Sequence, residues 1–173
     1  MIEVKGLYKS FEDKTVLSDI NASFENGKTN LIIGQSGSGK TVLMKCIVGL
    51  LTPEKGEVLY DGRNLVLMGK KEKKMLRKEM GMIFQSAALF DSMSVLDNVM
   101  FPLNMFSNDT LRDRTKRAMF CLERVNLTEA KDKFPGEISG GMQKRVAIAR
   151  AIALNPQYLF CDEPNSGLDP KTS

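Results

Sequence analysis

The sequence predicts an α/β fold, in which a sheet and its flanking helices form a core and a helical block is inserted between two strands. Three observations lead to this prediction. A glycine-rich loop, 34–41, joins a short apolar strand at 29–33 to an amphipathic helix after Lys40. A second apolar strand, 158–161, ends in two acidic residues. The stretch between these segments, 86–153, is dominated by helical patterns.

The other elements follow from the same patterns. Short runs of apolar residues from 2–7 and 16–24, separated by turn signals, predict short strands. Further strands and helices are expected at 57–60, 80–84, 111–125 and 139–154. The predicted domains are therefore a core made of residues 1–85 and 154–173 and a helical subdomain of residues 86–153.

Composition and charge disfavour several classes of protein. The net charge is only +4 and the basic residues are spread along the chain, so no nucleic-acid partner is expected. The densest basic run, 70–74, is interpreted as a solvated helix face. Three widely spaced cysteines without any histidine disfavour a disulfide framework or a zinc site, and Cys161 is expected in the core. No apolar run approaches the ~20 residues of a membrane span, and the first residues do not resemble a signal peptide.

The glycine-rich loop matches the pattern G-x-x-x-x-G-K-T in full. Gly37 and Gly39 would let several backbone N–H groups converge on phosphate oxygens at the start of a helix. Lys40 would reach the β- and γ-phosphates, and the Thr41 hydroxyl would bind Mg²⁺. A chance glycine-rich turn is the alternative, and the flanking strand and helix argue against it.

The acidic pair after the second apolar strand suits the same chemistry. Asp162 would hold Mg²⁺ through water, and Glu163 would orient or deprotonate an attacking water molecule. An ordinary strand end that meets solvent is the alternative, and the phosphate loop upstream makes it the weaker one. The prediction requires Lys40 and Asp162 to meet around one magnesium-bound triphosphate.

A third segment opens the last predicted helix. Ser139 is expected to cap that helix, and Gly140 and Gly141 leave backbone N–H groups accessible to an anion. Taken alone, this segment is better explained as a simple turn from a loop into a helix.

Together these segments resemble the nucleotide-binding subunit of ABC transporters, over essentially all 173 residues. The resemblance implies a P-loop NTPase core that binds ATP, with the N-terminal antiparallel β-subdomain and the inserted helical subdomain. In chain order, the family motifs match Walker A at 34–41, the Q-loop at Gln85, the signature at 139–143, Walker B at 159–162 and the D-loop at 166–169.

The resemblance implies ATP and Mg²⁺ as cofactors and assigns roles to individual residues. The catalytic residues would be Glu163, Lys40 and Gln85, and Mg²⁺ would be held by Thr41, Gln85 and Asp162. The nucleotide would contact Phe11, Gly34, Gln35, Ser36, Gly37, Ser38, Gly39, Lys40, Thr41 and Val42, and it would contact Ser139, Gly140 and Gly141 of a second subunit. Phe11 would stack on adenine, although a role as a core residue of a strand is equally open.

The resemblance also implies partners. Two copies would pack head to tail as a homodimer that closes on ATP, and residues from near Gln85 to Phe101 would contact transmembrane permease subunits. The protein would be cytoplasmic, peripheral on the cytoplasmic face of the inner membrane. Segments 86–103 and 140–147 are similar to Mla-type ATPases, which indicates phospholipid transport. The alternatives are an ABC ATPase for amino acids or lipoproteins, a nucleotide-binding module without turnover, and a non-transport relative acting on ribosomes or DNA.

Two features predict that the C-terminal strands and helices of the family are absent from this chain. Asp169 and Pro170 would open a helix, yet only three residues follow them. The family also places a histidine after the D-loop, and this sequence contains none. We therefore expect the parent protein to be an ATPase and this chain alone to hydrolyse ATP slowly or not at all.

Overall fold

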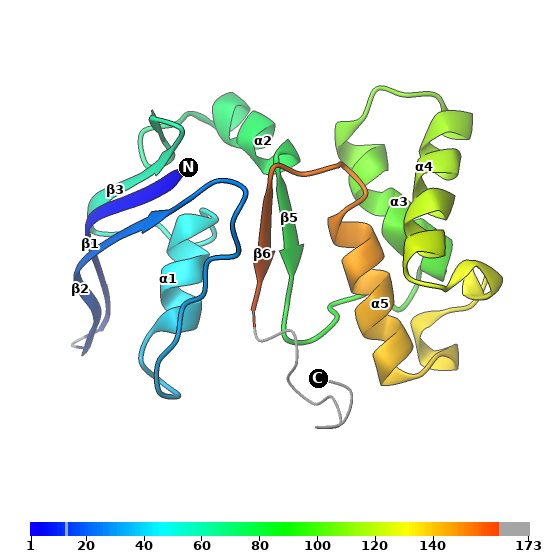
Figure 1. Cartoon of the computed structure of the whole chain (residues 1–173), viewed down its shortest axis with the longest axis horizontal. Coiled ribbons are helices and arrows are strands. Elements are labelled where there is room, and N and C mark those ends of the chain that lie inside the picture. The colour runs from blue at the N-terminus through cyan, green and yellow to red at the C-terminus, as the bar shows by residue number, and fades with distance from the viewer. Residues whose placement is uncertain (13, 163–173) are drawn as a thin grey trace. The chain divides into compact units, whose positions relative to one another are not determined.

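The computed structural model describes residues 1–12 and 14–162. The chain divides into two units, one made of Met1–Lys74 and the other beginning at Met75. Figure 1 labels most of the helices and strands of both units. The helix α2, Lys70–Lys78, spans the division, and most of its basic residues are exposed, as expected of a solvated helix face. The boundaries of the ATP-binding core and the helical subdomain stay predictions.

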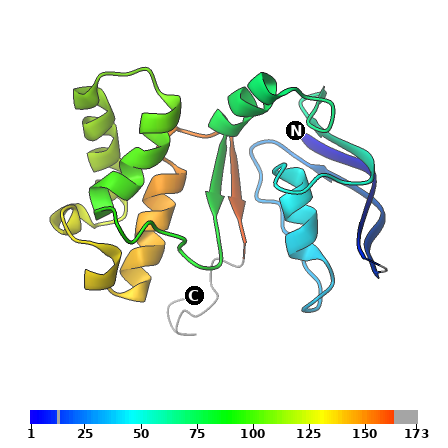
Figure 2. The same cartoon turned by 180° about the vertical axis from the view of Figure 1, so that it is seen from behind.

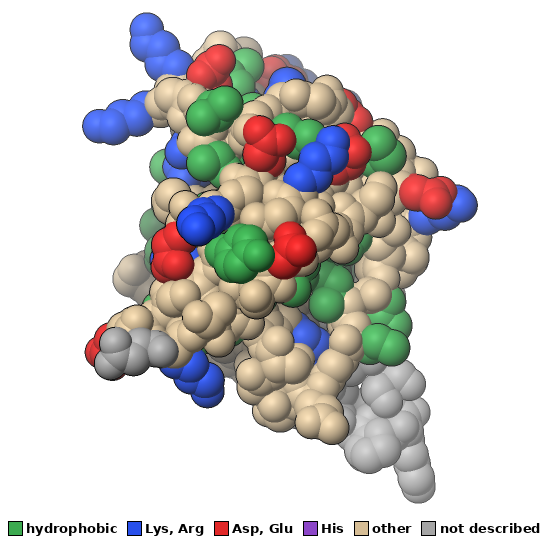
Figure 3. All heavy atoms as spheres, turned by 90° about the vertical axis from the view of Figure 1, so that its left-hand side faces the viewer, with side chains coloured by type: hydrophobic (Ala, Val, Ile, Leu, Met, Phe, Trp, Pro, Cys, Tyr) green, Lys and Arg blue, Asp and Glu red, His purple; other side chains and the backbone are tan. Residues whose placement is uncertain are grey.

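The first unit contains the antiparallel β-subdomain that the family resemblance implies. Four strands pair in the order β2-β1-β3-β4, and every pair is antiparallel (Figure 1). The strands are β1, Ile2–Phe11; β2, Lys14–Phe24; β3, Lys55–Tyr60; and β4, Arg63–Asn64. Val4 and Leu7 of β1 and Val58 and Tyr60 of β3 are fully buried, so the sheet supplies part of the core. Acidic and basic side chains are interspersed on the face shown in Figure 3.

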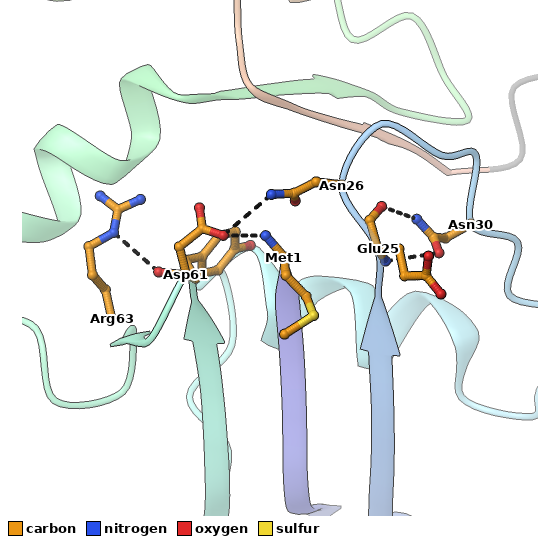
Figure 4. Close-up of polar contacts among 7 residues, drawn as sticks. Met1, Glu25, Asn26, Asn30, Asp61 and Arg63 are labelled. Carbon is orange, nitrogen blue, oxygen red and sulfur yellow. Dashed lines mark hydrogen bonds and ion pairs between the residues drawn. The ribbon is translucent and has the colours of Figure 1, made fainter.

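The turn after β3 forms where Asp61 and Gly62 predict it. Both residues have positive φ angles, 47° and 82°, which Asp and Gly tolerate better than other residues. The Asp61 carboxylate pairs with the Met1 ammonium and lies 3.5 Å from Asn26 Nδ2 (Figure 4). These contacts tie the end of β3 to the start of β1 and to the loop after β2.

Residues 29–33 do not form the buried strand that the sequence predicts. They have no strand conformation, and the side chains of Leu31 and Ile33 are 81% and 80% exposed. The Asn30 carboxamide instead hydrogen-bonds the backbone of Glu25 (Figure 4). A strand needs a neighbour to take its N–H and C=O groups, and no strand within the described residues pairs with this segment.

The helix α1, Lys40–Ile47, begins directly after the glycine-rich loop, as predicted. Leu43, Met44, Cys46 and Ile47 are buried on its apolar face. The buried hydroxyl of Tyr60 donates to the Ile47 carbonyl at 2.8 Å, which joins the end of α1 to β3. Gly49 follows with a φ of 73° and ends the helix.

The described part of the second unit, up to residue 162, combines a parallel strand pair with three main helices. β5, Met80–Ile83, pairs in parallel with β6, Tyr158–Cys161, with Gly81 opposite Leu159. The helices are α3, Val95–Phe106; α4, Leu111–Arg124; and α5, Gly140–Ala151. Two 3₁₀ turns, Thr128–Ala130 and Pro135–Glu137, lie between α4 and α5. Figure 2 shows the three helices from behind, gathered beside the strand pair.

The three helices enclose one apolar core. Val99 of α3, Leu122 of α4 and Val146 of α5 are each completely buried within it. Cys161, by contrast, is exposed, so its predicted place in the core is wrong. Among the described residues β6 pairs with β5 alone, and Leu159, two positions before Cys161, is likewise 50% exposed.

Within the described part of the chain, no helix has the length and hydropathy to cross a bilayer.

Candidate nucleotide-binding site

Glycine conformations shape the loop before α1. Gly37 and Gly39 have φ angles of 77° and 92°, in the region that favours glycine. A methyl group on Gly39 would lie 3.1 Å from Val16 Cγ1 and 3.2 Å from Leu17 Cδ2, so the loop passes close to β2. The Ser38 N–H donates to the Gln35 carbonyl at 3.2 Å and closes a tight turn. The backbone therefore has the compact curve that a phosphate-binding loop needs.

The loop curls around the side chain of Lys40. Its ammonium donates to the carbonyl oxygens of Gly34 and Gln35, at 3.0 Å each. The first N–H groups of a helix have no acceptor inside the helix, and the helix dipole adds positive potential there. An ammonium group and the start of α1 thus share one exposed loop. An arriving phosphate could replace the two carbonyls as the partner of Lys40.

The structure places the predicted phosphate-contacting residues on this single turn from loop into helix. They are Gly34, Gln35, Ser36, Gly37, Ser38, Gly39, Lys40, Thr41 and Val42. Residues 34–38 are exposed, and 39–42 are half-buried. The loop is accessible to a ligand from solvent, and its helix is anchored by the buried face of α1.

Gln85 and Asp162 lie at one edge of the parallel strand pair. Gln85 follows β5 in an exposed bend, and Asp162 follows β6 directly. The Asp162 N–H donates to the Ile83 carbonyl at 2.9 Å, which holds the two strand ends together. Carboxylate and amide oxygens suit Mg²⁺, so these two of the three predicted magnesium ligands fit the ion chemically.

The other predicted catalytic and magnesium-binding residues belong to the first unit or lie outside the described residues. Lys40 and Thr41 belong to the first unit, so their predicted meeting with Asp162 stays a prediction. Glu163 and the D-loop residues 166–169 lie outside the described residues.

The predicted signature segment forms an open helix start. Ser139 is the N-cap of α5, and its hydroxyl accepts a hydrogen bond from the Met142 N–H at 3.3 Å, as predicted. Gly140 and Gly141 are exposed, and a methyl group on either would meet no atom within 4 Å. The Gln143 side chain donates to the Pro135 carbonyl at 2.9 Å and holds the preceding turn. The helix start therefore faces solvent and could accept an anion from outside the chain.

Phe11 ends β1 with its ring 44% exposed, so the interpretation as a strand-core residue is wrong. Its neighbours in β1 are held by Glu54, which accepts from the Ser10 N–H at 2.9 Å and lies 3.4 Å from the Lys9 ammonium. The Ser10 hydrogen bond, followed by Lys9, lowers the pKa of Glu54. The Lys9 ammonium also lies 5.3 Å from the centre of the Phe11 ring. The strand pattern around Phe11 did not predict the contacts that Lys9 and Glu54 make at this end of β1.

Sequence reasoning also missed a buried amide beside the Q-loop segment. The completely buried Asn98 of α3 accepts from the Phe90 N–H at 2.8 Å. Its amide nitrogen donates to the carbonyls of Phe90, Met93 and Ser94 at 3.0–3.1 Å. This residue fixes the chain that leads from Gln85 into α3. Its only sequence signal is an Asn among apolar residues at helical spacing.

Comparison with known proteins agrees with these features. The family described as ABC transporter matches residues 17–166. The chain belongs to the ABC transporter family. Among solved ABC structures, it is similar to the dimeric structure of MJ0796, a bacterial ABC transporter cassette, with a TM-score of 0.91 at 33% identity, over 99% of this chain and 78% of that chain. A post-hydrolysis state of the same cassette, bound to ADP and Pi, gives a TM-score of 0.89 at 33% identity, over the same shares.

Curated ABC relatives differ in their described substrates. A probable ribonucleotide transport ATP-binding protein mkl from Mycobacterium leprae is 44% identical over 98% of this chain and 49% of its own length. A methionine import ATP-binding protein MetN from Legionella pneumophila is 41% identical over 100% and 50%. The intermembrane phospholipid transport system ATP-binding protein MlaF from Haemophilus influenzae is 42% identical over 98% and 64%. The chain spans about half the length of the first curated relatives that it matches.

Proposed function

We propose that this chain is the nucleotide-binding part of an ABC transporter ATPase and that it binds ATP with Mg²⁺. The loop that curls around Lys40, with its ammonium 3.0 Å from two carbonyls, carries this proposal. Lys40 and the N–H groups at the start of α1 bind the phosphates. Thr41, Gln85 and Asp162 supply the hydroxyl, amide and carboxylate oxygens for Mg²⁺, and the exposed ring of Phe11 stacks on adenine.

In the parent protein, water attacks the γ-phosphate in line with the leaving group. Glu163 polarises this water, and Lys40 stabilises the charge that develops on the phosphate oxygens. Mg²⁺, when bound, neutralises part of the phosphate charge. Glu163→Gln in the parent should leave ATP binding intact and stop turnover, because an amide cannot act as the base. Turnover near that of the unsubstituted parent would show that another group is the base.

A second copy of the chain completes the site. The exposed, uncrowded start of α5 supports this step, because Ser139, Gly140 and Gly141 can approach a phosphate bound to another subunit. The dimeric ABC cassette among the similar structures supports it as well. Ser139→Arg should spare ATP binding by the single subunit and block dimerisation driven by ATP. Unchanged dimerisation in light scattering would contradict the shared site.

The cargo we propose is a phospholipid, moved between bacterial membranes by permease subunits that contact residues near Gln85 to Phe101. In this arrangement the protein is peripheral on the cytoplasmic face of the inner membrane. The similarity to MlaF supports the assignment. The similarity to MetN favours a second candidate, an ABC ATPase that energises amino acid import. The permease and any bound lipid or amino acid that co-purify with the parent separate the two.

The basic test measures ATP binding and phosphate release together. Calorimetry with Mg²⁺ and ATP should give saturable binding to the chain, and Lys40→Ala should weaken it. Saturable binding without phosphate release would favour a nucleotide-binding module, and release above background would favour an active ATPase. Failure of the unsubstituted chain to bind ATP would contradict the proposed function.

A further inference from the structure

Two arginines of the second unit each hold a pair of backbone carbonyls. Arg150, in the last turn of α5, donates to the Ala88 carbonyl at 2.8 Å and to the Ala87 carbonyl at 2.9 Å. Arg117, in α4, donates to the carbonyls of Ala153 and Ile152, both at 2.8 Å. A guanidinium binds two acceptors with a rigid planar fork, so each pair forms a defined clamp. The two clamps differ in what they hold.

Arg117 holds the end of α5, whereas Arg150 holds the chain that follows the sheet edge. Ala87 and Ala88 lie two and three positions after Gln85 and belong to no helix or strand. Ala88 has a φ of 47°, a left-handed conformation that is costly for a residue with a Cβ atom. Such a conformation persists only where surrounding contacts impose it. The two hydrogen bonds from Arg150 are contacts of that kind, one made at the strained residue and one at the residue before it.

The same turn of α5 also rests against β5. A methyl group on Gly81 would lie 2.4 Å from the Ala151 carbonyl oxygen, so the end of the helix approaches the strand as closely as a glycine allows. Burial lowers the pKa of Arg150, whose guanidinium keeps its charge at neutral pH. The C-terminal turn of α5 is thus fixed both to β5 and to Ala87 and Ala88, in the segment that follows β5.

We propose that Arg150 is a positioning residue that fixes the backbone after Gln85 to the helix that begins at Ser139. α5 is a continuous helix over Gly140–Ala151, so a clamp at its last turn also sets the position of its first turn. The amide at the sheet edge and the glycines at the helix start therefore move together. This inference deepens the proposed function and rests on it for the role of Gln85.

The first test measures the mobility of the backbone in the full chain. Arg150→Met keeps the apolar stem and removes both hydrogen bonds, and Arg117→Met removes the matched clamp. We expect NMR order parameters of residues 85–89 to fall from about 0.85 to below ~0.6 in Arg150→Met and to stay unchanged in Arg117→Met. Unchanged values in Arg150→Met overturn the proposal, and so does an equal fall in both variants, since that shows general loosening.

The second test measures how the loss of the Arg150 clamp changes the Mg²⁺ dependence of ATP binding. ATP affinity is measured by calorimetry at limiting and at saturating Mg²⁺. Arg150→Met should weaken binding about tenfold at limiting Mg²⁺, the size expected for one charge-assisted hydrogen bond, and change little at saturation. Arg150→Lys should recover part of the loss, and Arg117→Met should match the unsubstituted chain. An equal loss at both Mg²⁺ concentrations overturns the positioning role. If the unsubstituted chain binds no ATP, the proposed function fails, and the order parameters alone decide the clamp.

Discussion

Two helices in the described part of the chain have glycines at their start, and these glycines serve different purposes. α1 begins after Gly39, whose left-handed conformation and tight approach to Val16 leave no room for a side chain. α5 begins at Ser139 with an ordinary side-chain cap, and Gly140 and Gly141 have open space around them. At α1 the glycine is required by the fold of the single chain. At α5 the fold tolerates a larger residue, so a need for glycine there must come from a ligand or partner.

The largest expected effect is at α1. Lys40→Ala should weaken binding of ATP with Mg²⁺ roughly hundredfold, because it removes an ammonium group with charge-assisted bonds to the phosphates. Calorimetry measures the change. Lys45→Ala, which removes a charge from the last turn of the same helix, serves as the control and should bind as the unsubstituted chain does. Equal affinities for both variants would contradict the assignment of the loop.

Gly39→Ala should lower the free energy of unfolding by about 1–3 kcal/mol, because alanine is strained at a φ of 92° and its methyl group would crowd Val16 and Leu17. Urea unfolding measures the loss. Gly37→Ala is the matched control, since Gly37 shares the positive φ but has no atom within 4 Å of an added methyl group. A loss of equal size in both variants would show that crowding of the added methyl group against Val16 and Leu17 does not contribute to the loss of stability.

Ser139→Ala should lower the free energy of unfolding by about 1 kcal/mol through loss of the cap on α5. Thermal melts of the monomer measure the change. Ser139→Asp, which can accept the same hydrogen bond from Met142, should retain most of the stability. An alanine variant as stable as the unsubstituted chain would mean that the 3.3 Å bond contributes nothing.

Gly141→Ala should have the smallest effect on the monomer, with the opposite sign. Gly141 is the second residue of α5, so alanine should be favoured there by at most the about 0.5–1 kcal/mol of a helix interior, and open space surrounds this position. The same methyl group should hinder dimerisation driven by ATP, because it would stand between the helix start and a phosphate. A stabilised monomer that still dimerises normally would contradict the proposal that the start of α5 binds a phosphate of the partner's nucleotide.

The sequence predicted the elements whose signals are local. α1, α4, α5 and the antiparallel strands follow from apolar periodicity, and the turn at Asp61 follows from residues that tolerate a positive φ. The ABC family followed from the resemblance of several motifs, in their order along the chain, to those of the family. The prediction of a strand at 29–33 was wrong because a strand depends on a distant partner. The prediction of Cys161 in the core was also wrong, because burial depends on distant elements and, among the described residues, β6 pairs with β5 alone. Arg150 escaped notice because its clamp joins residues more than 60 positions apart, which no local pattern reveals.

The apolar run at 29–33 has a practical consequence for anyone who handles the protein. It carries no charge, and two of its large side chains are about 80% exposed. Short uncharged segments of this kind stack readily into fibrils when chains are crowded. Storage concentration should therefore govern the useful lifetime of a sample, and a lysine in place of Leu31 should extend that lifetime by adding colloidal repulsion.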